Sequence, residues 1–221
     1  MDKLVTLLAL TSGWELLAVL LAAAYVVLAI RQSLWCWPAA AVSASIYTVL
    51  FLHSGLVMES ALQLFYVLMA GYGFWQWSQL SRKGGVGSNR PLAISTRPWR
   101  WHLAWIAALV VCTLLIGSLL ALYSRAELVW LDTTTTVFSL FATFLVARKL
   151  LENWLYWIII DLTYVGLFWY KGFYPTAILF AIYTVMACVG YVKWQQQYRA
   201  NARANVRTQA RKQETLNAHH R

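Results

Sequence analysis

Acidic residues are scarce in this chain of 221 residues, which has 8 Asp and Glu against 18 Lys and Arg. Charged residues of both signs make up only 12% of the sequence, whereas hydrophobic residues make up 61%. Several apolar stretches run well beyond the length of a core helix, which indicates a polytopic α-helical membrane protein. A lipid-exposed open sheet is excluded, because hydrocarbon cannot satisfy the polar groups of strand edges.

The chain also lacks the residue patterns of most enzymes. Its three cysteines, Cys36, Cys112 and Cys188, lie in apolar segments and indicate neither a disulfide framework nor a metal site. We find no metal-type spacing of His, Cys and Asp, no Gly-x-Ser-x-Gly elbow and no phosphate-binding loop. We therefore expect no enzymatic activity and no cofactor.

Seven apolar segments are long enough to cross a bilayer. They cover approximately residues 12–30, 35–52, 56–77, 101–122, 129–147, 154–170 and 173–194. If the N-terminus is outside, 15 of the 18 basic residues fall in inner segments, and only Lys3, Arg125 and Lys171 fall outside. The positive-inside rule therefore predicts an outer N-terminus and a cytoplasmic C-terminus. The first segment is expected to be retained rather than cleaved as a signal peptide, because no net positive charge precedes it.

Two polar regions, an inner loop and the C-terminal tail, divide the chain into parts. Residues 78–98 form the longest inner loop and are rich in Gly and Pro. The basic tail after Lys193 is expected to extend the last span as a helix before fraying, in contact with anionic lipid rather than RNA. The predicted parts are a first three-helix bundle (1–77), a cytoplasmic loop with a linker helix (78–128), a second three-helix bundle (129–194) and a basic cytoplasmic tail (195–221).

An internal repeat relates residues 31–77 to residues 148–194. A shift of 117 residues aligns 13 identical residues in 47 positions without a gap. Among the matched pairs are Trp37 and Trp154, Tyr47 and Tyr164, Gly55 and Gly172, Gly73 and Gly190, and Trp77 and Trp194. The repeat predicts two parallel three-helix bundles joined by an odd linker helix. Parallel repeats are typical of transporters, which hold the substrate near the bilayer midplane.

Asp161 lies near the middle of the sixth predicted span, where a charge is unfavourable unless it faces a cavity or a partner. Helical spacing places Trp154, Trp157, Tyr164 and Phe168 on the same face. An acid within an aromatic stripe could receive an organic cation. Protonation, or a hydrogen bond to a neighbouring helix, is the alternative explanation.

Other polar and aromatic residues extend this hypothesis to neighbouring spans. The predicted substrate-binding residues, expected to face one cavity, are Trp157, Asp161, Tyr164, Gln63, Tyr66, Phe180 and Tyr183. Three residues could lie at a mouth of the pathway, although a helix terminus explains each more simply: Asp132, Glu59 and Asn153. Several tryptophans fit an interfacial belt, namely Trp75, Trp77, Trp99, Trp101 and Trp154.

The motif Glu152-Asn153-Trp154 followed by Trp157 and Asp161, with Arg148-Lys149 before it, resembles the PnuC-type vitamin transporters. Gln63 and the later Tyr-Gly-x-Trp-x-Trp support the same resemblance, which covers residues 12–195. It implies a SWEET-like fold, a homotrimer, facilitated diffusion of a vitamin precursor, and trapping of that precursor by a separate cytosolic kinase. Family members move nicotinamide riboside, thiamine or riboflavin. The chain departs from the nicotinamide riboside pattern at Asp161 and Ala70, where Asn is expected.

We therefore predict facilitated uptake of a cationic B-vitamin precursor, nicotinamide riboside, across the bacterial inner membrane. Thiamine is the alternative substrate, and a membrane-embedded vitamin-binding subunit without transport of its own is a more distant alternative. The expected partners are the small-molecule vitamin and the lipid bilayer, not nucleic acid. A neutral flavin fits an ionised Asp161 poorly.

Overall fold

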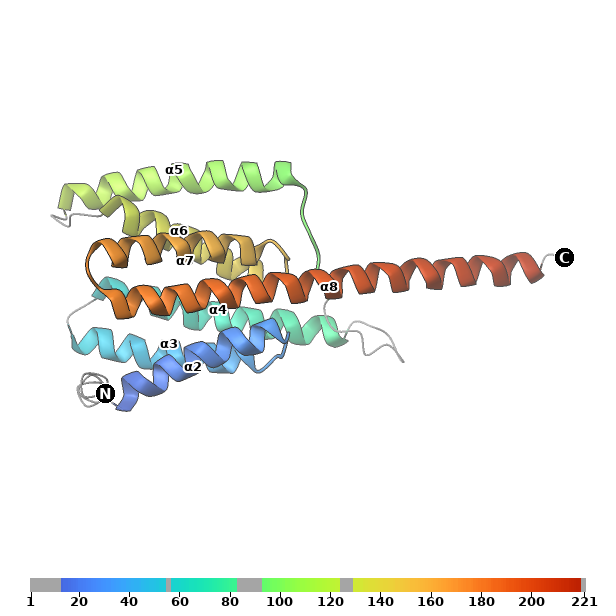
Figure 1. Cartoon of the computed structure of the whole chain (residues 1–221), viewed down its shortest axis with the longest axis horizontal. Helices are drawn as coiled ribbons and strands as arrows, with labels where there is room; N and C mark the ends of the chain where they lie inside the picture. Colours follow the sequence, from blue (N-terminus) through green and yellow to red (C-terminus); the bar gives the residue numbers. More distant parts are fainter. Residues whose placement is uncertain (1–12, 55–56, 83–92, 124–128, 220–221) are drawn as a thin grey trace. The chain divides into compact units, whose positions relative to one another are not determined.

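The computed structural model describes residues 13–54, 57–82, 93–123 and 129–219 (Figure 1). Within these residues the chain forms seven helices, and the prediction of an all-helical fold is confirmed there. They are α2 (Gly13–Ile30), α3 (Cys36–His53), α4 (Val57–Arg82), α5 (Trp99–Tyr123), α6 (Val129–Ala147), α7 (Asn153–Tyr170) and α8 (Tyr174–His219). Lys3, Gly55, Arg125 and residues 83–92 of the predicted loop lie outside the described residues.

Five of the helices in the described part of the chain are long and apolar enough to cross a membrane. They are α2, α3, α5, α6 and residues Tyr174–Gln209 of α8. The other two, α4 and α7, coincide with predicted spans but carry polar residues, including Gln63 and Asp161 respectively. These polar residues lower the mean hydropathy of the two helices.

The last helix is much longer than a membrane span. It runs from Tyr174 to His219 over 46 residues, and Figure 1 shows it as one uninterrupted helix. At 1.5 Å per residue its length is roughly 70 Å, more than twice the hydrocarbon thickness of a bilayer. The basic tail therefore prolongs the last span as a helix, as predicted.

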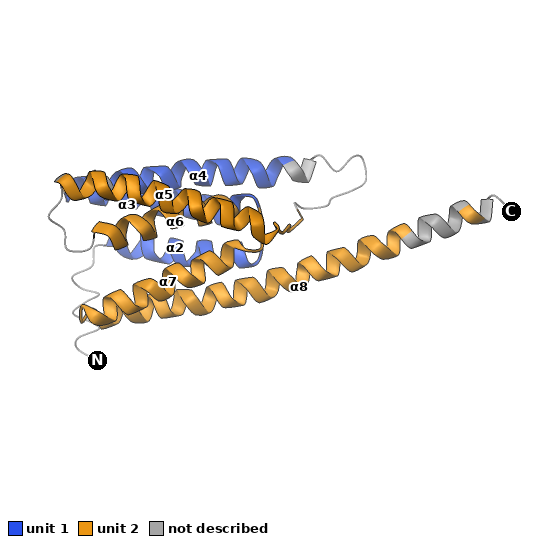
Figure 2. Cartoon of the chain, turned by 90° about the horizontal axis from the view of Figure 1, so that it is seen from above, with its two compact units in different colours: residues 1–91, 146–148 blue, residues 92–145, 149–221 orange. Residues whose placement is uncertain are grey.

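The chain divides into two compact units (Figure 2). Unit 1 contains residues 1–91 and 146–148, and unit 2 contains residues 92–145 and 149–221. In unit 1, α3 packs against both α2 and α4, and in unit 2, α7 packs against α8. A hydrophobic cluster in unit 2 joins α6 to α7, with α5 side chains around it. Its buried members are Phe141, Ala142, Leu145, Leu150, Tyr156 and Ile160.

Each unit contains one tryptophan pair at matched repeat positions. The rings meet edge to face, with centroids 5.3 Å apart in Trp37–Trp77 and 5.4 Å apart in Trp154–Trp194. The first ring of each pair also lies over a glycine, Gly73 or Gly190, where an added Cβ would come closer than 3 Å to the ring. Only glycine allows this close approach of ring and helix.

Two of the five tryptophans that the sequence assigned to an interfacial belt, Trp77 and Trp154, belong to these buried pairs instead. Trp77 is 5% exposed and Trp154 is 3% exposed, so neither is an interfacial residue. Both are buried because each packs edge to face against its paired indole. Trp75 and Trp99, by contrast, are 53% and 66% exposed, as a belt requires.

The repeat also extends to the backbone and to ring stacking. Gln32 and Lys149 occupy matched positions before α3 and α7, and both have left-handed φ angles, 55° and 50°. Tyr47 stacks on Phe51 at 5.6 Å, and its counterpart Tyr164 stacks on Phe168 at 5.9 Å. The similarity of the two sequence segments therefore corresponds to similar local structure in each unit.

Candidate functional site

Asp161 lies midway along α7, and its side chain is 6% exposed. The residues on its helix face are buried or half-buried, whereas Ile159 and Leu162 on the opposite side are 66% and 54% exposed. The face predicted from helical spacing is therefore the face that packs into the protein. The carboxylate does not point to the exposed apolar side that lipid would cover.

The Asp161 carboxylate has no hydrogen bond or salt bridge to any residue in the described part of the chain. The hydroxyl groups of Tyr164 and Tyr183 lie close enough to the Asp161 carboxylate to interact with its charge. A buried carboxylate without a charged or hydrogen-bonding partner is strongly unfavourable. This residue is thus the point in unit 2 at which a cationic ligand would gain the most.

Four aromatic rings from α7 and α8 form a cluster that includes Tyr164, which lies one turn from Asp161 on α7. Tyr164 stacks on Phe180 with centroids 4.6 Å apart and planes inclined by 30°. Phe168 stacks on Phe180 at 5.5 Å, and Tyr183 meets Phe180 edge to face at 6.1 Å. Three of the predicted binding residues, Tyr164, Phe180 and Tyr183, are therefore close neighbours.

Tyr164 is also held by α6. Its hydroxyl donates a hydrogen bond of 2.9 Å to Oγ1 of Thr135, a residue that is 4% exposed. The sequence predicted a helix terminus at Asp132, and Asp132 lies in the first turn of α6, which begins at Val129. The only sequence signal for Thr135 is its place in a run of threonines.

Two other predicted residues of unit 2 are not among the rings that stack around Phe180. Trp157 is half-buried and, like Tyr164, packs against the hydrophobic cluster that joins α6 and α7. Asp132 is exposed in the first turn of α6, within electrostatic range of the Tyr164 hydroxyl. Asp132 thus lies close to the aromatic cluster but at the surface of the chain.

Gln63 and Tyr66 belong to unit 1, where both are half-buried on α4. The ring of Tyr66 meets that of Phe65 at 6.1 Å. Glu59 is exposed in the first turn of α4, the position expected from its sequence context. A single cavity lined by residues of both units stays a prediction.

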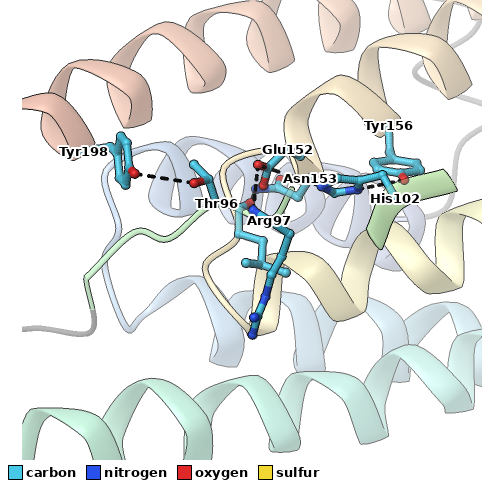
Figure 3. A network of polar contacts seen from close by, with 8 residues as sticks. Thr96, Arg97, His102, Glu152, Asn153, Tyr156 and Tyr198 are labelled. Atoms are coloured by element: carbon cyan, nitrogen blue, oxygen red, sulfur yellow. Dashed lines mark hydrogen bonds and ion pairs between the residues drawn. The ribbon is translucent and has the colours of Figure 1, made fainter. Parts of the chain in front are cut away.

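A network of polar contacts surrounds the first residues of α7 (Figure 3). The Glu152 carboxylate accepts a hydrogen bond of 3.0 Å from the backbone N–H of Arg97 and lies 3.8 Å from Nε2 of His102. Nδ1 of His102 lies 3.1 Å from the Tyr156 hydroxyl. Glu152 occupies the N-cap position of α7, but its side chain makes no capping hydrogen bond. The Glu152 side chain instead contacts Arg97, before α5, and His102, within α5.

Further hydrogen bonds connect the segment before α5 to the residues around the start of α7 and to α8. Ser95 donates to the carbonyl of Lys149 at 3.1 Å, and its own carbonyl accepts from Leu151 at 2.9 Å. The Thr96 hydroxyl lies 3.4 Å from that of Tyr198 on α8 (Figure 3). Asn153 is completely buried and donates to the Leu150 carbonyl at 2.5 Å. The contacts of Ser95 and Thr96 tie the segment before α5 to the residues just before α7 and to α8, which is a structural role.

Unit 1 contains an apolar hollow of about 290 Å³ between α3 and α4. It is lined by Trp37, Pro38, Ala41, Ala70, Gly71 and Phe74. Ala70 is one of the two positions at which the nicotinamide riboside pattern has Asn. No charged side chain lines this hollow, so it offers no counter-charge to a cationic ligand.

Residues 12–196 match the family model described as nicotinamide mononucleotide transporter. The chain is 27% identical over 177 residues to the riboflavin/roseoflavin transporter RibM of Streptomyces davaonensis, covering 80% of this chain and 81% of that protein. It is 25% identical over 178 residues to the nicotinamide riboside transporter PnuC of Escherichia coli K12, covering 69% and 72%.

One solved structure has a similar fold. The crystal structure of the vitamin B3 transporter PnuC superimposes with a TM-score of 0.69, covering 90% of this chain and 87% of that chain. The two sequences are 22% identical. At this level of identity the similarity concerns the fold alone.

Proposed function

Since the chain belongs to the nicotinamide mononucleotide transporter family, which includes PnuC, it is a multi-pass membrane protein of vitamin-transporter type, and we propose that it carries nicotinamide riboside. The proposed process is facilitated diffusion into a bacterial cell across its inner membrane. The single observation that supports this substrate best is the buried Asp161 carboxylate, which has no ionic partner among the described residues.

The charge of the substrate follows from the chemistry around Asp161. Nicotinamide riboside has a permanently cationic pyridinium ring, which an ionised carboxylate attracts strongly where water is largely excluded. The Asp161 charge interacts with the hydroxyls of Tyr164 and Tyr183, and the rings of both tyrosines pack against Phe180. A desolvated flat cation gains about 0.5–2 kcal/mol from the face of an aromatic ring. Charge and aromatic contacts therefore favour the same ligand.

We further propose that Trp157 of unit 2 and Gln63 and Tyr66 of unit 1 contribute to this site. The equivalent environments of the two tryptophan pairs support two parallel three-helix bundles, 1–77 and 129–194, with a linker helix in 78–128 and a basic tail in 195–221. The distribution of 15 of 18 basic residues supports an outer N-terminus and a cytoplasmic C-terminus. A homotrimer and trapping by a cytosolic kinase are proposed from the family resemblance.

Facilitated diffusion is proposed because Asp161 is the only acidic residue buried within a helix in the described part of the chain. Transport driven by protons or sodium ions commonly uses additional buried acidic or oxygen-rich sites. No group of three or more potential metal ligands occurs among the described residues. The gradient of the substrate itself would then drive uptake.

Riboflavin is a second candidate substrate, which the 27% identity to RibM favours. Its isoalloxazine ring is neutral, so it would gain no charge–charge attraction from an ionised Asp161 and would leave that charge without a counter-charge. Thiamine has a cationic thiazolium ring and satisfies the charge requirement as well as nicotinamide riboside does. The three compounds therefore differ in ways that a binding experiment can separate.

Calorimetry of the purified protein with each of the three compounds tests the proposal. We expect nicotinamide riboside to bind most tightly and riboflavin most weakly. Tightest binding of thiamine would keep the charge argument and change the substrate. Tightest binding of riboflavin would overturn both. Tight binding without exchange in proteoliposomes would instead indicate a vitamin-binding subunit.

A further inference from the structure

Four consecutive threonines, Thr133 to Thr136, lie near the start of α6. The hydroxyls of Thr133 and Thr134 donate to carbonyl groups of their own helix, at 2.7 Å and 2.6 Å. Thr135 does the same and in addition accepts the hydrogen bond from Tyr164 at 2.9 Å. Of these three hydroxyls, that of Thr135 is the one that connects α6 to the aromatic cluster.

The hydrogen bonds of Thr135 fix the direction of its contact with Tyr164. A threonine hydroxyl has a single hydrogen, and that of Thr135 points to the carbonyls of Leu131 and Asp132, at 3.0 Å and 3.1 Å. Oγ1 must therefore accept from Tyr164, and this uses the only hydrogen of the Tyr164 hydroxyl. The lone pairs of the Tyr164 oxygen are then all that this group can offer to a ligand.

The ring of Tyr164 is restrained as well as its hydroxyl. It stacks on Phe180 at 4.6 Å and on Phe168 at 5.9 Å, while Thr135 is 4% exposed. Tyr164 lies one turn from Asp161 on the same face of α7. An ionised carboxylate also only accepts hydrogen bonds. The two neighbouring groups therefore present acceptors and negative charge, and no donor.

The first half of the repeat lacks this arrangement. Carried into the preceding helix, the same shift of 117 residues places Ala18, which has no hydroxyl, opposite Thr135, and within the repeat it places Ala44 opposite Asp161. The polar contact there is instead a hydrogen bond of 2.8 Å from the Ser43 hydroxyl to the Ala18 carbonyl. Thr135 and Asp161 thus occur together in the half that contains the candidate site.

From these contacts we infer that Thr135 is a positioning residue that determines substrate specificity through Tyr164. This inference rests on the proposed function. Because Thr135 holds the Tyr164 hydroxyl as a donor to α6, Tyr164 and Asp161 present only acceptors to the substrate. The site then selects a flat ring that has positive charge and hydrogen-bond donors. The pyridinium carboxamide of nicotinamide riboside fits, whereas the carbonyl acceptors of an isoalloxazine ring do not.

The test compares Thr135→Val with Thr135→Ser and with the control Thr134→Val in calorimetry of the purified protein. Valine keeps the shape of threonine but cannot accept the hydrogen bond, so Tyr164 regains a free donor. We expect nicotinamide riboside to bind about 5- to 10-fold more weakly to Thr135→Val. Riboflavin affinity should stay constant or increase. Thr135→Ser, which keeps the hydroxyl, and Thr134→Val should stay within about twofold of wild type.

A double-mutant cycle with Tyr164→Phe separates positioning from a general loss of stability. The combined variant should bind nicotinamide riboside no more weakly than Tyr164→Phe alone, since both changes remove the same hydrogen bond. If Thr135→Val does not fold, Tyr164→Phe and Thr135→Ser decide the question: a loss in the first and none in the second supports the inference.

The possible failures can be told apart. If wild type binds nicotinamide riboside and Thr135→Val binds it as tightly as Thr134→Val does, the inference about Thr135 is wrong and the proposed function stands. Additive losses in the double-mutant cycle would contradict it equally. If wild type binds none of the three compounds, the proposed function fails, and the inference fails with it.

Discussion

Replacing Asp161 by Asn removes one negative charge and almost no volume, so it isolates the electrostatic part of recognition. The side chain is 6% exposed and has no ionic partner in the described part of the chain. The substitution therefore breaks no salt bridge or hydrogen bond that the described residues form. It also removes an unfavourable buried charge, so the variant should fold and be at least as stable as wild type.

The magnitude follows from the Coulomb energy at this degree of burial. Two unit charges about 5 Å apart, with an effective dielectric constant near 20, attract each other by roughly 3 kcal/mol. The asparagine dipole retains part of this attraction, and the ring spreads the ligand's charge. A net loss of about 2 kcal/mol corresponds to roughly 30-fold weaker binding of nicotinamide riboside.

Calorimetry with nicotinamide riboside and riboflavin, on Asp161→Asn and on the control Asp132→Asn, measures this loss. Asp132 is exposed on α6, so water and salt screen its charge, and its removal should change the affinity by less than about threefold. Riboflavin affinity should not fall in Asp161→Asn. An unchanged affinity for nicotinamide riboside in Asp161→Asn would refute the proposed role of the charge.

Three further predictions concern packing, aromatic contacts and topology. Gly190→Ala should lower the melting temperature, because the added Cβ would overlap the Trp154 ring and overpacking costs about 1–3 kcal/mol. The control Gly166→Ala should not lower it, since the space around Gly166 is open. Equal melting temperatures of the two variants would contradict the packing of the Trp154 ring over Gly190. Phe180→Leu should weaken binding of nicotinamide riboside by roughly 3- to 10-fold with little change in melting temperature, and an unchanged Kd would exclude this ring from the site. Ser88→Cys should resist impermeant thiol reagents in intact cells, and labelling from outside would overturn the proposed topology.

The helices and the buried face of α7 could be predicted from sequence because they depend on local patterns. Long apolar segments mark the spans, and spacings of three and four place Trp157 and Tyr164 on the face of Asp161. That face is the buried one in the structure. The tryptophan pairs were harder, because a tryptophan at a helix end fits an interfacial belt and a buried contact equally well. The glycines aligned in the repeat, Gly73 and Gly190, were the available signal that a ring lies over each of them.

Thr135 could not be predicted, because its role depends on a residue of another helix. A threonine in a membrane helix normally satisfies its hydroxyl on its own backbone, as Thr133 and Thr134 do. Four adjacent threonines look alike in sequence, and only the position of Tyr164 distinguishes one of them. The hydrogen bond from the Arg97 backbone to Glu152 also joins residues far apart in the sequence and could not be predicted. A carboxylate at the start of a helix suggests a local cap instead.

Counterflow in proteoliposomes tests most directly whether this chain carries a cationic vitamin through a site that depends on Asp161. Vesicles loaded with unlabelled nicotinamide riboside, without any ion gradient, are diluted into labelled nicotinamide riboside. We predict transient accumulation of label by wild type, a strong reduction in Asp161→Asn, and no accumulation in empty vesicles. Exchange that requires a sodium or proton gradient, or that proceeds equally well in Asp161→Asn, would contradict the account.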